Sequence, residues 1–273
     1  MDDVMTKKIN KQYFFLSGLH RSGNTVLSSI LNQNPSIYVS PLSPVVEFMW
    51  RCSNEDFEET ITYPNKNSIK NTVSNIIKNF YKDIEKPIVI DRNKSWLVPD
   101  NLSMIKKYIN ENPKIIFTIR PLKECIASQI NIMKNHLLWQ MKSNNFNFNY
   151  SITENDNIAE FLLSTNNYFL EKNSYQSFID NKENNIIHLV KYDELVNYPE
   201  KTMFNIYNFL GIENFHHNFY NIKSKENGLD FKMNYPEDLH KIKERLEFSK
   251  LDPRRFLSKE IIEKCDSLDL FYK

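Results

Sequence analysis

Short apolar runs alternate with segments of helical periodicity along most of the chain. Four of these runs, at residues 13–17, 88–91, 114–119 and 186–191, are mainly apolar and end in polar residues. Continuous apolar runs of this length are typical of parallel strands that are covered on both faces. We therefore predict a strand at each of them.

Apolar residues recur at helical spacing in most of the segments between these runs. Pro199 suits the first turn of a helix, and Gly211 suits the C-terminal cap. Strands that alternate with helices predict an α/β fold with a central, mostly parallel sheet flanked by helices, and ligands then bind at the carboxyl ends of the strands. The helices are expected at residues 25–32, 43–52, 69–81, 99–110, 122–136 and 199–210, with a longer one that follows the Thr153-x-x-Asp156 cap and continues to Tyr175.

Length and composition narrow the class of protein. The 273 residues contain no Gly/Ser/Pro-rich linker, so we expect a single domain. A net charge of +1 argues against a general binder of nucleic acid or of membrane surfaces. The three cysteines form no C-x-x-C pair, which favours reduced thiols over disulfides or a zinc site. Without a signal-like apolar core near residue 1 or an apolar run of roughly 18 residues, the expected location is the cytoplasm.

The segment GLHRSGNT, from Gly18 to Thr25, separates the first predicted strand from the first predicted helix. It fits the phosphate-binding P-loop pattern G-x-x-x-x-G-K-[ST], except that Asn24 occupies the lysine position. Such a loop directs backbone N–H groups and the positive end of a helix at an anion. Arg21 then supplies the cation, while His20 is expected to lie at the rim of the loop without a part in the chemistry. The alternative is a tight turn with an incidental arginine.

A second candidate anion site follows the predicted strand at residues 114–119. Arg120 ends this strand, and Ser128 lies eight residues later on the next predicted helix. An arginine fork binds phosphate oxygens in a bidentate manner, so the two residues are expected to meet on a ligand. An arginine at a strand end is also a common partner in surface ion pairs.

Three blocks of the sequence together resemble the family of sulfotransferases that use 3′-phosphoadenosine 5′-phosphosulfate (PAPS), in the manner of a soluble bacterial member. They occur in that family's order and at roughly its spacing: SGLHRSGNT, TIRPLKECIAS and HLVKYDELVNYPEKTMFNIYNFLGI. The resemblance implies a P-loop-like sulfotransferase fold over residues 1–273. It further implies a donor-binding core at 10–212 and a helical closing segment at 213–273.

The resemblance also assigns roles to residues around the donor. It implies PAPS as donor substrate and no metal, since a sulfuryl group carries less charge than the β- and γ-phosphates of a nucleotide. Tyr192 would pack near the adenosine, unless it is a core tyrosine at a strand end. His240 and Lys243 match a short C-terminal motif and would close over the donor, unless they lie on a solvated helix face. The 3′-phosphate would contact Arg120 and Ser128, and the 5′-phosphosulfate would contact Arg21, Ser22, Gly23, Asn24 and Thr25.

The implied reaction is an in-line displacement at sulfur, in which Arg21 stabilises developing charge. A base must accept the proton of the attacking hydroxyl or amine. The position of a glutamate in tyrosylprotein-type members reads VSPLSP here, and the nearest carboxylate is Glu47. Asp91 ends the predicted strand at 88–91, and Lys94 follows it. We therefore predict Glu47 or Asp91 as the base and Lys94 as a charge-stabilising group.

The sequence does not identify the acceptor, and it allows two other functions. Aromatic residues in segments 41–63 and 136–150 suit a small-molecule, carbohydrate or peptide acceptor. The run that ends at Asp91 also resembles a Walker B strand, which would suit a kinase-like phosphotransferase that uses Mg-ATP. A third reading is a protein that binds a nucleotide or glycan without turnover.

Overall fold

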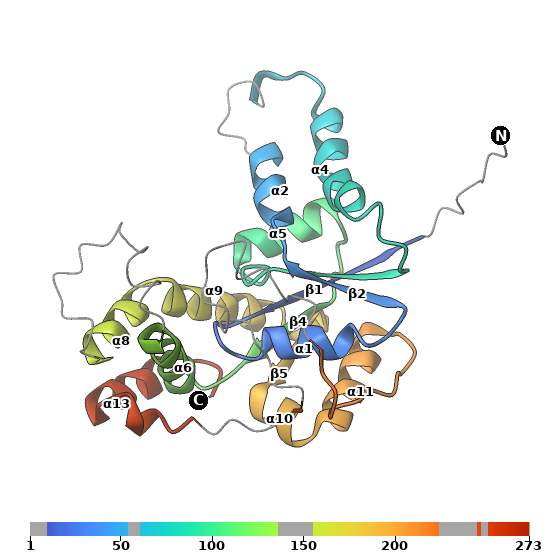
Figure 1. The fold of residues 1–273 in the computed structure, drawn as a ribbon. Coiled ribbons are helices and arrows are strands. Elements are labelled where there is room, and N and C mark those ends of the chain that lie inside the picture. Colours follow the sequence, from blue (N-terminus) through green and yellow to red (C-terminus); the bar gives the residue numbers. More distant parts are fainter. Residues whose placement is uncertain (1–9, 54–60, 136–154, 224–244, 247–250, 273) are drawn as a thin grey trace.

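A five-stranded sheet forms the centre of the molecule (Figure 1). The structure is a computed structural model that describes residues 10–53, 61–135, 155–223, 245–246 and 251–272. All pairings between neighbouring strands of the sheet are parallel, and the order is β2-β3-β1-β4-β5. The strands are β1 (Gln12–Gly18), β2 (Ile37–Leu42), β3 (Ile88–Arg92), β4 (Ile115–Ile119) and β5 (Ile187–Lys191).

The central strand β1 lies where the strand order changes direction. Phe15 pairs with Asp91 of β3, and Ser17 pairs with Phe117 of β4. Because all strands are parallel, their carboxyl ends lie at the same edge of the sheet, and ligands of open α/β sheets bind at such a switch point. The chain segments that follow β1, β3 and β4 therefore meet at one place.

Helices cover both faces of the sheet (Figure 1). Adjacent residues of β1 point to opposite faces, so that Phe15 packs under one helical layer and Leu16 under the other. Both are fully buried, which explains why the strand is a continuous apolar run. One layer contains α2 (Val45–Ser53), α4 (Lys66–Phe80) and α5 (Pro99–Tyr108), and the other contains α1 (Asn24–Leu31), α10 (Tyr192–Asn197) and α11 (Pro199–Leu210).

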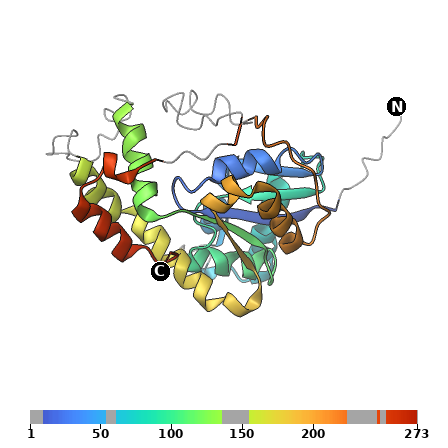
Figure 2. The ribbon, with the colours of Figure 1, turned by 90° about the horizontal axis from the view of Figure 1, so that it is seen from below.

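A third apolar cluster lies beside the sheet. Figure 2 shows α6, α8 and α13 grouped there, while α9 runs from this group and contacts α5. The residues after α13 attach to the start of α6, where Asp269 Oδ2 accepts a hydrogen bond of 2.9 Å from the Leu122 amide. These helices are α6 (Leu122–Asn135), α8 (Asn155–Ser164), α9 (Asn166–Asp180) and α13 (Lys259–Leu268), and two 3-10 turns complete the fold at η1 (Lys182–Asn184) and η2 (Pro253–Arg255).

The predicted α/β fold with a parallel central sheet is confirmed, and so are the four predicted strands. Strand β2 was not predicted, because Pro41 lies within it and proline lacks the N–H group that a central strand needs. The structure places β2 at the edge of the sheet, where it pairs only with β3 and shifts register between Val39 and Leu42.

The prediction of one long helix up to Tyr175 is wrong. Two helices, α8 and α9, meet at Thr165, whose φ of −114° and ψ of −135° lie outside the helical region. The Thr165 hydroxyl donates to the Phe161 carbonyl at 3.0 Å, a local bond that competes with helix continuation. The short helix α10 was also missed. Within the described residues, none of the helices is both long and apolar enough to cross a membrane.

Candidate active site

The loop between β1 and α1 depends on two glycines. A Cβ atom on Gly18 would lie 2.1 Å from Thr118 Oγ1, so only glycine permits this approach of β1 to β4. Gly23 has a φ of 97° and caps α1, and a Cβ there would lie 2.8 Å from the Tyr192 ring. Arg21 also has a positive φ of 62°. The loop therefore combines left-handed and right-handed backbone conformations, a combination that is typical of anion-binding loops.

Side chains inside the loop fix its shape. The Ser22 hydroxyl is buried and lies 2.6 Å from both the Leu19 carbonyl and Thr118 Oγ1. Asn24 occupies the usual lysine position and donates to the Leu19 carbonyl at 3.3 Å and to Ser22 Oγ at 3.4 Å. Its side-chain oxygen finds no donor among the described residues. Ser22 and Asn24 thus stabilise the loop, in which the Ser22 amide also donates to the Leu19 carbonyl at 3.3 Å.

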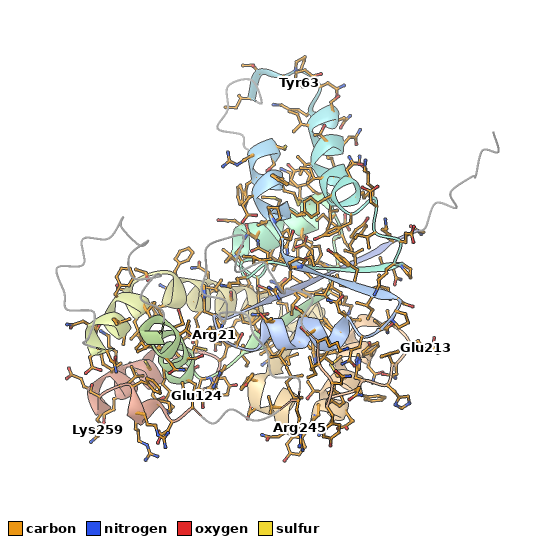
Figure 3. All side chains as sticks on the ribbon, viewed as in Figure 1. Arg21, Tyr63, Glu124, Glu213, Arg245 and Lys259 are labelled. Atoms are coloured by element: carbon orange, nitrogen blue, oxygen red, sulfur yellow. The ribbon has the colours of Figure 1, made fainter. Side chains whose placement is uncertain are left out.

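Two arginines from distant parts of the sequence meet beside this loop. Arg21 Nε donates to Ser128 Oγ at 3.3 Å, and an Arg120 terminal nitrogen donates to the Arg21 carbonyl at 3.4 Å. Arg120 also pairs with Glu124 at 2.9 Å and stacks at 4.3 Å from the centre of the Tyr192 ring. Figure 3 labels Arg21 and Glu124 in this part of the molecule. The structure therefore brings together four residues that the sequence had assigned to the donor.

The charges of the two arginines act on each other. The protein around the Arg21 guanidinium and the charge of Arg120 both lower the pKa of Arg21. Arg120 is itself only 6% exposed. Like charges held close in a partly enclosed site are typical of a site that binds an anion, because the anion removes the repulsion.

Lys94 follows β3 and reaches the same loop. Its Nζ lies 3.0 Å from Nδ1 of His20, and its carbonyl accepts a hydrogen bond of 2.6 Å from the Ser17 hydroxyl. Burial and the charges of Arg92 and Arg21 lower the pKa of Lys94 to about 8. The prediction placed His20 at the rim of the loop, whereas the structure joins it to Lys94 across 74 positions of sequence.

Asp91 has a structural environment. Its side chain is 0% exposed and accepts hydrogen bonds from Ser43 Oγ at 2.7 Å, Tyr81 Oη at 2.6 Å and Trp96 Nε1 at 2.7 Å. Burial raises its pKa despite these donors. A general base must come within hydrogen-bond reach of the substrate proton. This geometry argues against Asp91 as the base and assigns it to holding the segment after β3.

Glu47 lies in the first turn of α2 and is exposed to solvent. Its Oε1 is 3.5 Å from the Asn93 side-chain nitrogen, one residue before Lys94. One helical turn later, Trp50 is 41% exposed and donates its indole N–H to Asn101 Oδ1 at 2.6 Å. An accessible carboxylate and an anchored aromatic ring therefore lie on the same helix at the carboxyl edge of the sheet.

Part of the predicted site lies outside the described residues. This applies to His240 and Lys243 and to the aromatic residues of segment 136–150. Sequence reasoning, in turn, missed Glu124 and Asn93. The spacing of four between Arg120, just before α6, and Glu124, in its first turn, was a usable signal, whereas the Asn93–Glu47 contact depends on the fold.

Comparison with known proteins places the chain in a family. Residues 14–217 match the profile of the sulfotransferase family. No curated protein matched the chain. A sulfotransferase from Mycobacterium avium has a TM-score of 0.54 at 12% identity, covering 97% of this chain and 77% of that one. A mouse sulfotransferase complexed with PAP (adenosine 3′,5′-bisphosphate) has a TM-score of 0.53 at 14% identity, and the alignment covers 96% of this chain and 88% of that one.

The sulfotransferase domain from the curacin biosynthetic pathway is similar over a comparable length. Its TM-score is 0.51 at 13% identity, and the alignment covers 97% of this chain and 94% of that domain. At these identities the structural likeness establishes the fold, and the profile match over residues 14–217 establishes the family. The chain belongs to the sulfotransferase family.

Proposed function

We propose that the protein transfers a sulfuryl group from PAPS to a hydroxyl or amine of an acceptor. The observation that carries this proposal is the meeting of Arg21, Arg120 and Ser128 at the carboxyl ends of β1 and β4. PAPS has a phosphate and a phosphosulfate at opposite sides of its ribose, and the site has one arginine for each. Similarity to a mouse sulfotransferase complexed with PAP supports the same donor.

Each end of the donor has its own set of residues. Arg120 and Ser128 bind the 3′-phosphate, because the guanidinium is already oriented by Glu124 and by the Tyr192 ring. Arg21, the backbone N–H groups of Gly23 and Asn24 and the Thr25 hydroxyl bind the 5′-phosphosulfate. Tyr192 then lies between the loop and Arg120, on the adenosine side of the site.

The reaction is an in-line displacement. The acceptor oxygen or nitrogen forms a bond to sulfur while the bond from sulfur to the 5′-phosphate oxygen breaks, and adenosine 3′,5′-bisphosphate (PAP) leaves. Negative charge develops on the bridging oxygen, where Arg21 and Lys94 stabilise it. Donors of this kind are worth about 3–4 kcal/mol of transition-state stabilisation. Arginine does not release its proton at useful pH, so the contribution of Arg21 is electrostatic.

Glu47 accepts the proton of the acceptor. It is exposed, lies beside Asn93 and approaches the segment that carries Lys94. Trp50 lies one turn further along α2 with its ring partly exposed, and we assign it to the wall of the acceptor site. The acceptor class stays open among small molecules, carbohydrates and peptides.

A kinase-like function fits these contacts less well. Its Walker B aspartate would be Asp91, whose carboxylate already accepts three hydrogen bonds in a fully buried position. A residue in that environment is a poor ligand for Mg²⁺ shared with a nucleotide.

The test is a thermal-shift comparison of PAP with Mg-ATP, each with and without chelator. A ligand at about 100 times its dissociation constant adds roughly 2.7 kcal/mol of stability. We expect PAP to raise the melting temperature equally with and without chelator. A shift that needs Mg-ATP and disappears with chelator would contradict the proposal.

A further inference from the structure

We propose that His20 is a positioning residue for Lys94. The neutral imidazole carries its proton on Nε2 and accepts a hydrogen bond at Nδ1. This bond holds the Lys94 ammonium group at the sulfuryl end of the donor. The contact is present in the protein without ligand, whereas its role in transfer rests on the proposed function. His20 itself touches no reacting atom in this proposal.

The backbone brings His20 and Lys94 close together. His20 belongs to the loop after β1 and directly precedes Arg21, while Lys94 comes two residues after the end of β3. Strands β1 and β3 are neighbours in the sheet. The Ser17 hydroxyl, at the end of β1, donates to the Lys94 carbonyl at 2.6 Å, which anchors the segment. Lys94 Nζ then reaches His20 Nδ1 at 3.0 Å.

The donor in this contact follows from chemistry. An ammonium group has three N–H donors and no acceptor, so the nitrogen that faces it must carry a lone pair. His20 Nδ1 is therefore unprotonated, and the imidazole proton lies on Nε2. The positive charges around His20 act in the same direction, because burial, Lys94 and Arg21 lower its pKa to about 3.

A neutral partner has a consequence that a carboxylate would not have. Arg120 is paired with Glu124, which offsets its charge, whereas no ion pair of Lys94 is found in the described part of the chain. The imidazole fixes the direction of the ammonium group and leaves its charge and two of its N–H donors for an anion. The charged groups that act on Lys94 are Arg92 and Arg21, and the carboxylate on the neighbouring helix α2 is Glu47.

Four variants separate this role from a packing role. His20→Asn keeps an acceptor oxygen close to the position of Nδ1, whereas His20→Leu fills similar space without an acceptor. Both are also made in a Lys94→Met background. Circular dichroism first verifies that each variant is folded, and isothermal titration with PAP at pH 7 then gives its dissociation constant.

We expect His20→Leu to weaken PAP at least tenfold and His20→Asn to weaken it less than threefold. In the Lys94→Met background, His20→Leu should add less than a twofold loss, because two residues that act as a unit are not additive. An equal loss with and without Lys94 would overturn the proposal. An Asn variant as weak as the Leu variant would also overturn it.

A pH series adds a readout that packing alone would not change. In the wild type, PAP affinity should fall as the pH rises above about 8, where Lys94 loses its proton. Removal of the imidazole acceptor makes the Lys94 ammonium less stable and lowers its pKa. The loss of PAP affinity should therefore begin at a lower pH in His20→Leu than in the wild type, and at the wild-type pH in His20→Asn. Identical profiles in all three proteins would contradict the assignment.

The tautomer can be observed without any ligand. In protein labelled with ¹⁵N-histidine, the ring signals lost in His20→Asn identify His20. We expect the Nε2-protonated neutral form throughout pH 6–8 and a mixture of tautomers in Lys94→Met. Titration near the ordinary value of 6.5, or an Nδ1-protonated ring, would overturn the contact. Failure of the wild type to bind PAP would instead contradict the proposed function, and this spectrum would still decide the contact.

Discussion

The cations on the two sides of β1 have opposite surroundings. Arg120, after β4, is 6% exposed, pairs with Glu124 at 2.9 Å and stacks on Tyr192. Lys94, after β3, faces a neutral imidazole and is repelled by Arg92 and Arg21. A cation that is oriented by a carboxylate suits the binding of a fixed phosphate. A cation that keeps its whole charge suits a group on which charge grows during the reaction.

This difference separates binding from chemistry within one site. On the β4 side, substitutions should mainly change which adenosine nucleotide binds. On the β3 side, together with α2, they should mainly change the rate of transfer. The following substitutions test the division, beginning with the largest expected effect.

Glu47→Gln should lower the rate of sulfuryl transfer by about 10²–10⁴-fold, which is the usual contribution of a general base. PAP affinity should stay within a factor of three, because Glu47 lies on the acceptor side. The measurement is PAP release from PAPS with a panel of phenol, sugar and amine acceptors. Asp91→Asn is the matched control: it should lower the melting temperature, since it disturbs a buried carboxylate with three donors. A transfer rate that is unchanged in Glu47→Gln would remove this residue from the mechanism.

Arg21→Ala should lower the same rate by about 10²–10³-fold, since it removes a preorganised donor from the transferring group. Arg21→Lys keeps the charge without the fork and should lose less. Because Arg21 also contacts Ser128, PAP binding by both variants is measured beside the rate. A variant without the side chain that retains its turnover would refute the assigned role.

Arg120→Ala should weaken PAP by about 1.5–3 kcal/mol, or roughly 10–150-fold, which is the range for a hydrogen bond to a charged group. Adenosine 5′-phosphosulfate lacks the 3′-phosphate, so its affinity should change less than threefold. Titration calorimetry with both nucleotides gives the ratio. Glu124→Gln keeps the arginine and should have a smaller effect. Equal losses for the two nucleotides would mean that Arg120 does not read the 3′-phosphate.

Lys94→Met should stabilise the ligand-free protein at pH 7 by about 1–3 kcal/mol while it weakens PAP. The folded-state pKa of about 8 lies below the ordinary value of 10.5, so the charged lysine costs stability below pH 8. This cost fades as the pH rises from about 8 to 10.5. The difference in melting temperature between variant and wild type should therefore be larger at pH 7 than at pH 10. If the variant melted at a lower temperature than the wild type at pH 7, the charged Lys94 would not be destabilising the folded protein.

Local features of the sequence predicted much of this architecture. The apolar runs of β1, β3, β4 and β5 identify buried parallel strands, and Gly18 and Gly23 identify the tight turn between β1 and α1. Strand β2 escaped detection because Pro41 is acceptable only at an edge, and a single sequence does not reveal which strand lies there. The break at Thr165 depends on one hydroxyl that competes with a helical hydrogen bond.

The contacts that assign chemical roles to residues were harder to predict from the sequence. Asp91 was a reasonable base by its place at the end of a predicted strand, yet Ser43 and Tyr81 approach it from separate segments and donate hydrogen bonds to its Oδ2. The His20–Lys94 pair likewise spans 74 positions. A residue's chemical role follows from its neighbours in space, and those neighbours are set by strand order rather than by local pattern.

The bond from Asp269 to the Leu122 amide has a consequence for the order of assembly. This amide begins the helix that follows Arg120, and its acceptor is made 147 residues later. On a ribosome, the loop after β1 and the segment after β3 emerge long before the residue that anchors this helix. The start of the helix that carries Ser128 therefore becomes anchored only after Asp269 has been synthesised.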